Sequence, residues 1–133
     1  MVGNINTANV NATNVNANSI ILGSTTAISC GTATTTSTTT SQTIVTVPVG
    51  GITGVEFLVK STDTNGVLNK YSMCGIHAVT DGNSTCDWST FGSVALGGST
   101  GTFSVVVAGG NLKLQVNPSS SNSTVWTTQY RYL

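Results

Sequence analysis

Over residues 42–133, apolar and polar residues alternate in short runs, which is the pattern of half-buried β-strands. Turn signals such as Asn65-Gly66 and Gly109-Gly110 separate the runs. This stretch therefore predicts an all-β fold of about seven strands, an antiparallel β-sandwich of which the jelly roll is one variant. The runs that predict the strands cover residues 43–49, 55–60, 71–79, 88–96, 103–107, 112–116 and 125–132.

Residues 3–22 carry a different pattern, in which an apolar residue recurs every five positions. Because five is odd, a flat strand would place successive apolar residues on opposite faces. A β-solenoid turn instead directs each of them inward, and these pentads resemble those of the pentapeptide-repeat family. The resemblance implies a short repeat-containing β arm before the sandwich. The apolar pentad centres are Ile5, Val10, Val15 and Ile20.

Four pentads make about one coil of such a solenoid, whereas stacked repeats need about three units to be stable. We therefore expect the arm to bury its centres against other copies of the chain, as a homotrimer, or against another protein. The alternative is an Asn-rich leader that becomes ordered only on a partner. The Thr/Ser-rich stretch 32–43 predicts an extended connector. The predicted division is thus an arm over 1–41 and a sandwich domain over 42–133.

Only eight of the 133 residues are charged, four basic and four acidic, so the net charge is zero. Four scattered cations do not make the basic surface that binds a phosphate backbone, and nucleic acid is not an expected partner. No apolar run approaches the ~20 residues of a membrane-spanning helix, and residues 1–20 lack the features of a signal peptide. We therefore expect no membrane partner. A chain without net charge tends to associate with other protein surfaces.

The three cysteines predict free thiols rather than a disulfide framework, because their number is odd and no leader is expected. Cys74, His77, Cys86 and Asp87 supply residue types that bind zinc. Positions 74 and 77 differ by three, however, so a single strand directs them to opposite faces. We predict free thiols at Cys30, Cys74 and Cys86, no metal site and no cofactor.

Residues for catalysis are scarce. His77 is the sole histidine, and nucleophilic catalysis by a serine needs a histidine base oriented by a third group. Asp81 and Asp87 flank a turn and would supply the two carboxylates of a glycosidase, but Asx hydrogen bonds within the turn are the simpler explanation. The Gly-rich turn 97–101 lacks the lysine and the helix of a phosphate loop. We therefore expect that the chain is not an enzyme.

Four aromatic residues are candidates for contacts with a glycan or with another subunit: Trp88, Trp126, Tyr130 and Tyr132. The last three share one parity within the predicted final strand and therefore lie on one face. Such a stripe is typical of a core and equally of a subunit interface. A glycan site also needs polar groups that converge in a cleft, and alternation does not reveal a cleft.

Several segments have a recognisable form: TTTSTTTSQT, GVEFLVKSTD, HAVTDGNST and, most tellingly, the hairpin GTFSVVVAGGNLKLQVNP over 101–118. With these segments, residues 34–133 resemble a family of small β-rich structural proteins of tailed bacteriophages, common in phages of cyanobacteria. The resemblance implies a virion protein that assembles in the host cytoplasm.

Two functions follow from this resemblance. The first is a homotrimeric capsid-decorating (cement) protein, which would stabilise the shell through its arm by contacts with the major capsid protein or another virion protein. The short length of the chain favours this function. The alternative is a tail-fibre or fibre-tip module that binds host-surface glycans.

Overall fold

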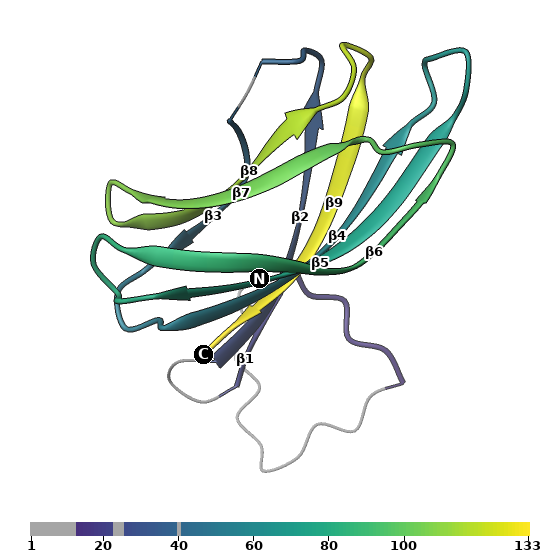
Figure 1. Cartoon of the computed structure of the whole chain (residues 1–133). Helices are drawn as coiled ribbons and strands as arrows, with labels where there is room; N and C mark the ends of the chain where they lie inside the picture. Colours follow the sequence, from purple (N-terminus) through teal and green to yellow (C-terminus); the bar gives the residue numbers. More distant parts are fainter. Residues whose placement is uncertain (1–12, 23–25, 40) are drawn as a thin grey trace.

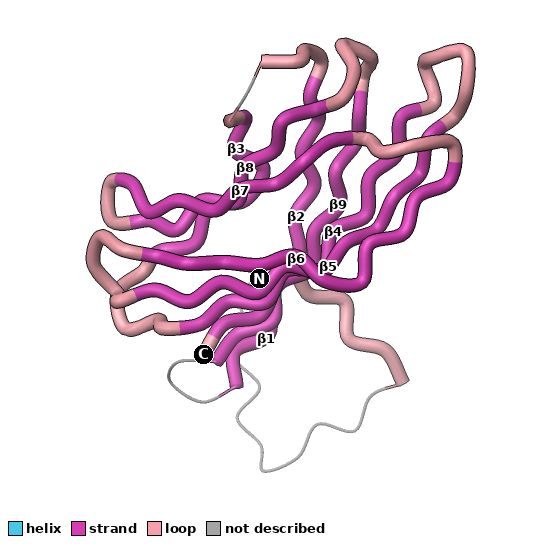
Figure 2. Tube along the Cα trace, viewed as in Figure 1, coloured by secondary structure: helices cyan, strands magenta, loops and turns pink. Residues whose placement is uncertain are grey.

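The computed structural model describes residues 13–22, 26–39 and 41–133. Across these residues the chain forms nine strands and no helix, as the tube in Figure 2 shows. Accordingly, a helix long and apolar enough to cross a membrane is not found in the part of the chain that is described. The strands are β1 (Ser19–Leu22), β2 (Thr26–Thr35), β3 (Gln42–Pro48), β4 (Gly54–Asp63), β5 (Lys70–Thr80), β6 (Cys86–Leu96), β7 (Gly101–Ala108), β8 (Asn111–Pro118) and β9 (Thr124–Tyr132).

The strands form two antiparallel sheets. The large sheet has six strands in the order β1-β2-β9-β4-β5-β6, and the small sheet has three in the order β3-β8-β7. Figure 1 shows the small sheet lying over one face of the large sheet. This arrangement confirms the predicted antiparallel β-sandwich, and β3 to β9 are the seven strands expected over 42–133.

Strand β2 joins the large sheet beside the C-terminal strand. It pairs with β9 from Ala27 opposite Tyr132 to Thr35 opposite Thr124. The connector expected over 32–43 therefore begins later than predicted, because residues 32–35 are the end of a strand. Threonine is β-branched and favours an extended backbone, and a paired strand satisfies that preference as well as an unpaired connector does.

The predicted pentad centres are only partly described. Ile5 and Val10 lie outside the described residues. Val15 is exposed in the segment before β1, and Ile20 is exposed in β1 at the edge of the large sheet. The solenoid turn and the homotrimer both remain predictions.

The core lies between the two sheets. Alternation along the strands places Phe57, Ile76 and Trp126 of the large sheet on the face that meets the small sheet, and all three are fully buried. Leu112 and Leu114 of the small sheet are buried opposite them. The apolar surface that these side chains remove from water is the main source of the fold's stability.

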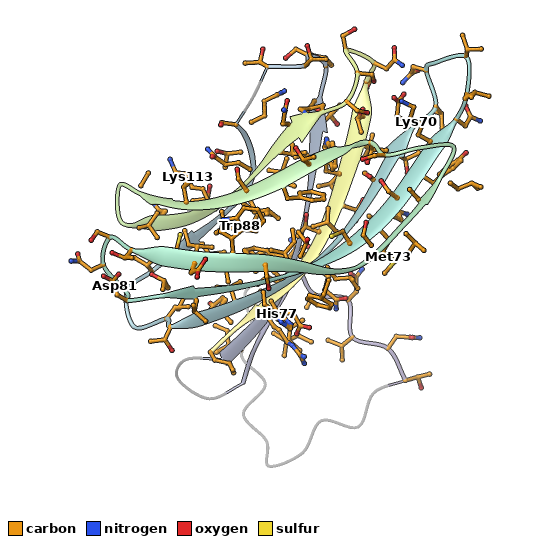
Figure 3. The ribbon with its side chains drawn as sticks, viewed as in Figure 1. Lys70, Met73, His77, Asp81, Trp88 and Lys113 are labelled. Atoms are coloured by element: carbon orange, nitrogen blue, oxygen red, sulfur yellow. The ribbon has the colours of Figure 1, made fainter. Side chains whose placement is uncertain are left out.

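The large sheet has a second face, which is directed away from the small sheet and which we call the outer face. Because side chains alternate along a strand, every second residue of β5 from Tyr71 to Val79 lies on it, as their common parity predicts. Figure 3 shows the contrast between the faces: Trp88 points toward the small sheet, and His77 points away from it.

The turn between β5 and β6 accounts for Asp81. Its Oδ1 accepts hydrogen bonds from the backbone N–H groups of Asn83, Ser84 and Thr85 at 2.9, 2.9 and 3.0 Å. These bonds, led by the one from Thr85, lower the pKa of the Asp81 carboxyl below its ordinary value. The predicted Asx hydrogen bonds are therefore present, and Asp81 is a residue that stabilises a turn.

Candidate functional site

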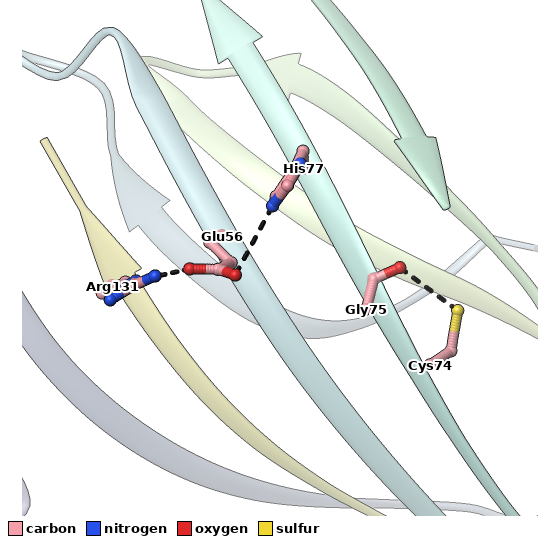
Figure 4. A network of polar contacts seen from close by, with 5 residues as sticks. All are labelled: Glu56, Cys74, Gly75, His77 and Arg131. Atoms are coloured by element: carbon pink, nitrogen blue, oxygen red, sulfur yellow. Dashed lines mark hydrogen bonds and ion pairs between the residues drawn. The ribbon is translucent and has the colours of Figure 1, made fainter. Parts of the chain in front are cut away.

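Three polar side chains meet on the outer face of the large sheet. Glu56 of β4 lies between Arg131 of β9 and His77 of β5, because the register pairs Glu56 with both residues. The Arg131 Nε–H donates a hydrogen bond to Glu56 Oε2, and His77 Nε2 lies 3.4 Å from Glu56 Oε1 (Figure 4). The three groups form a row across neighbouring strands.

The hydrogen bond from Arg131 stabilises the ionised form of Glu56. It is the largest of the effects that lower the pKa of Glu56 below the ordinary value of 4.5. Desolvation opposes it, and the hydrogen bond with His77 acts in the same direction as Arg131. At neutral pH the pair therefore combines a carboxylate with a guanidinium, which together offer hydrogen-bond acceptors and donors without net charge.

Beside this row, an aromatic ring covers a glycine of the neighbouring strand. Phe91 of β6 pairs with Gly75 of β5, and a Cβ atom added to Gly75 would lie only 2.3 Å from the Phe91 ring. The ring also contacts His77, with ring centroids 4.2 Å apart and an angle of 39° between the planes. Phe91 nevertheless remains 41% exposed. Gly75 and His77 thus support the ring from beneath and from one side, and leave aromatic surface open to solvent. We call this arrangement the Phe91 platform.

A hollow of about 260 Å³ opens next to the Phe91 platform. Its floor and walls come from β2, β4, β6 and β9, so four strands of one sheet shape it. Apolar and polar side chains both reach it. They include Ile28, Leu58 and Phe91 together with Glu56, Gln129 and Arg131.

This combination suits a ligand that has both an apolar face and hydroxyl groups. The C–H face of a sugar ring stacks on an aromatic ring, and its hydroxyl groups exchange hydrogen bonds with planar polar side chains. Glu56 offers acceptors, Arg131 offers donors, and Gln129 offers both. Binding sites of this kind combine apolar walls with a few polar groups that fix orientation.

The four aromatic residues predicted from the sequence lie on the other face. Trp126 is fully buried, its indole N–H donates a 2.9 Å hydrogen bond to Thr35 Oγ1, and its ring makes an edge contact with Phe103. Tyr130 packs against Phe57 with centroids 5.9 Å apart. Trp88, Tyr130 and Tyr132 are partly buried against the core. The common parity of Trp126, Tyr130 and Tyr132 is confirmed, and the face that they share is the one that packs on the small sheet.

Sequence reasoning missed the Phe91 platform because strict alternation fails in β6. The register between β5 and β6 shifts between Met73 and Gly75, so Phe91 and Val94 both lie on the outer face although they are three residues apart. Gly92, which adopts a φ of +58°, lies inside this shift. Two glycines within strands were the available signal, because such glycines mark bulges and close approaches.

The residues weighed as zinc ligands are not brought together. Cys74 is buried on the inner face, where desolvation raises the pKa of its thiol, whereas His77 is exposed on the outer face. Cys74 and Cys86 are free thiols that pack in or against the core, and Cys30 is free and exposed. Within residues 13–22, 26–39 and 41–133, no three metal-binding side chains gather at one point.

The sequence matches no protein-family model and no curated protein. Solved structures similar to the chain include three tailspike proteins of Acinetobacter phages. The tailspike of Acinetobacter baumannii phage AM24 is 10% identical with a TM-score of 0.49, and the match covers 80% of this chain and 26% of the tailspike. The tailspike gp49 of Acinetobacter baumannii bacteriophage Fri1 is described as a capsular polysaccharide depolymerase. It is 14% identical with a TM-score of 0.49, and the match covers 80% of this chain and 17% of gp49. The tailspike of Acinetobacter phage vB_ApiP_P1 is 11% identical with a TM-score of 0.47, and the match covers 98% of this chain and 26% of the tailspike.

The chain thus spans about a quarter or less of the length of each tailspike. All three are described as tailspike proteins, and none of the three descriptions mentions capsid decoration.

One expectation from the sequence is corrected by these comparisons. The chain was expected not to be an enzyme, whereas the Fri1 protein is described as a depolymerase and hence as an enzyme. We withdraw that expectation.

Proposed function

We propose that the chain is a tail-fibre-type module of a tailed-phage virion, which binds host-surface glycans on the outer face of its large sheet. The resemblance of residues 34–133 to phage structural proteins supports the virion setting. The single observation that carries glycan binding is the Phe91 platform beside the Glu56–Arg131 pair. It combines an exposed aromatic ring, held in place before any ligand arrives, with a carboxylate and a guanidinium whose charges cancel.

A held ring favours binding because its position does not have to be fixed when the ligand arrives. Ordering a flexible side chain at an interface costs about 0.5–1.5 kcal/mol. Gly75 leaves the space that the Phe91 ring occupies, and the His77 ring limits its movement along the sheet. The Glu56–Arg131 hydrogen bond holds the neighbouring polar groups in the same way.

The test is a glycan array probed with the full chain, followed by titration of the best bacterial surface glycan. Phe91→Ala is expected to weaken binding about tenfold, because it removes the stacking surface. Phe91→Tyr keeps an aromatic ring and is expected to bind as the original chain does. Val79→Ala is the matched control, since Val79 is exposed on the same face outside the lining of the hollow. Unchanged binding in Phe91→Ala would place the glycan elsewhere and overturn the proposal.

We also propose that the module acts as a homotrimer whose copies bury the pentad centres of the arm. What supports this is the exposure of Val15 and Ile20, two apolar centres that the described part of the chain leaves uncovered. A charge at a centre that becomes buried between copies would be costly. Light scattering should therefore give a lower mass for Val15→Asp than for Asn16→Asp, which adds the same charge beside the centre.

A further inference from the structure

We propose that the glycan bound at the Phe91 platform is a chain of several sugar units, which runs along β5 and makes a second aromatic contact with Tyr71. This inference rests on the proposed function and adds a binding residue and a minimum ligand length to it. The observation behind it is that two exposed aromatic residues, Phe91 and Tyr71, lie on the same face of the same pair of strands.

The spacing between the two aromatic residues follows from the register. Phe91 covers Gly75, and Tyr71 lies four residues before Gly75 on β5. At a rise of about 3.3 Å per residue, the two contacts are roughly 13 Å apart along the strand. A disaccharide stacked on Phe91 is too short to reach Tyr71, whereas a trisaccharide or longer chain reaches both.

The surface between the two rings is apolar and open. Met73 of β5 and Val94 of β6 pair directly on the outer face, and Leu96 pairs with Tyr71 in the next row. All three are exposed. We call Met73, Val94 and Leu96 the apolar strip. Val94 and Leu96 lie on this face only because of the shift in register beside Gly92, since strict alternation from Trp88 would direct both toward the small sheet.

A polar group borders the apolar strip on the side of β4. Lys60 is exposed and pairs with Met73 across the two strands. A sugar chain lying on the strip would direct C–H groups to Met73 and Val94 and hydroxyl groups to the Lys60 ammonium. The strip thus repeats the arrangement of the Phe91 platform, with apolar surface beneath the ligand and a hydrogen-bonding group at its side.

The experiment measures affinity against ligand length. The probe is one bacterial surface polysaccharide that binds in the array, cut by partial acid hydrolysis and separated into disaccharides, tetrasaccharides and hexasaccharides. Tyr71→Ala is expected to weaken hexasaccharide binding about tenfold and to leave disaccharide binding unchanged. Tyr71→Phe should behave as the original chain, and Phe91→Ala should weaken all lengths. Val79→Ala again serves as the control on the same strand.

The outcomes separate this inference from the proposed function. If Phe91→Ala weakens binding and Tyr71→Ala has the same effect at every length or none, the second contact is wrong and the glycan site stands. If neither substitution matters, both proposals fail. If Tyr71→Ala lowers the molecular mass in light scattering, a second copy covers the apolar strip and the inference is overturned. An unchanged melting temperature in Tyr71→Ala shows that a loss of binding is not a loss of folding.

Discussion

The two faces of the large sheet are built from the same strands and differ in almost everything else. On β5, Ile76 is fully buried against the small sheet, and His77, the next residue, is exposed on the outer face. On β9, Trp126 is fully buried while its neighbour Val125 is exposed. A shift of one residue in register would exchange the two sets.

The inner face of the sheet contributes most of the stability, and the outer face carries the groups of the proposed glycan site. The inner face buries large apolar side chains, each of which contributes about 1.5–3 kcal/mol, together with some small polar ones. The outer face has a glycine covered by a ring, two exposed aromatic residues and a row of paired polar groups. Substitutions on the inner face should therefore change stability, and substitutions on the outer face should change binding. Three substitutions test that division.

The largest effect is expected from Trp126→Ala. The substitution leaves a cavity in the core and removes the hydrogen bond to Thr35, which is itself buried. Large-to-small changes of a buried tryptophan cost about 3–5 kcal/mol of unfolding free energy. Urea denaturation measures the loss. Val125→Ala, one residue away on the outer face, should cost only about 0.5 kcal/mol. Equal losses in the two variants would contradict the division between the faces.

Gly75→Ala should separate binding from stability. The added Cβ would meet the far end of the Phe91 side chain rather than backbone, so the ring has to leave its place while the backbone of β5 keeps its position. We expect a loss of unfolding free energy of no more than about 1 kcal/mol, together with a loss of glycan binding as large as in Phe91→Ala.

The control for Gly75→Ala is Gly31→Ala in β2, where an added Cβ meets nothing within 4 Å. It should change neither stability nor glycan binding appreciably. Retained binding in Gly75→Ala would mean that the ring need not be held against the sheet.

The smallest effect is expected from the ion pair. Because the pKa of Glu56 is lowered in the folded chain, its contribution to stability is complete above the ordinary value of 4.5 and is lost as the pH falls through the lower, folded value. Arg131→Gln removes the main cause of that shift. The original chain should be more stable than this variant by about 0.2–1 kcal/mol at pH 7, which is the contribution typical of an exposed ion pair.

Denaturant titrations between pH 7 and pH 3 should show this difference shrinking below pH 4.5. Lys113→Gln, which removes the same charge from the small sheet, is the control and should show no such dependence on Glu56. A difference that is constant over the whole range would mean that Arg131 stabilises the fold by something other than its bond to Glu56.

Local alternation predicted much of the sandwich. The period of two over residues 55–59 places Val55, Phe57 and Val59 in the core, where all three are found. The turn at Asp81 was equally predictable, because an Asx turn depends on a few adjacent residues. These features are local, and their physics is contained in short stretches of sequence.

The pairing of β2 with β9 and the Phe91 platform were not predictable in this way. β2 is rich in small and hydroxyl-bearing residues, so its inner side carries no strong apolar signal, and its partner lies some 90 residues away along the chain. The platform depends on the shift in register beside Gly92, which reverses the parity of every later residue of β6. Alternation alone therefore gives no indication that Phe91, Val94 and Leu96 share one face.

The position of β9 sets the order in which the chain can mature. β9 follows all the other strands in sequence, yet it lies inside the large sheet between β2 and β4. While a ribosome is still making the chain, β2 and β4 have no strand between them, and Trp126 is missing from the core. The large sheet can therefore be completed only after β9 has been synthesised. A chain truncated before β9 would leave β2 and β4 unpaired on the sides that β9 joins and would leave the core without Trp126, so we expect it to be degraded by proteases.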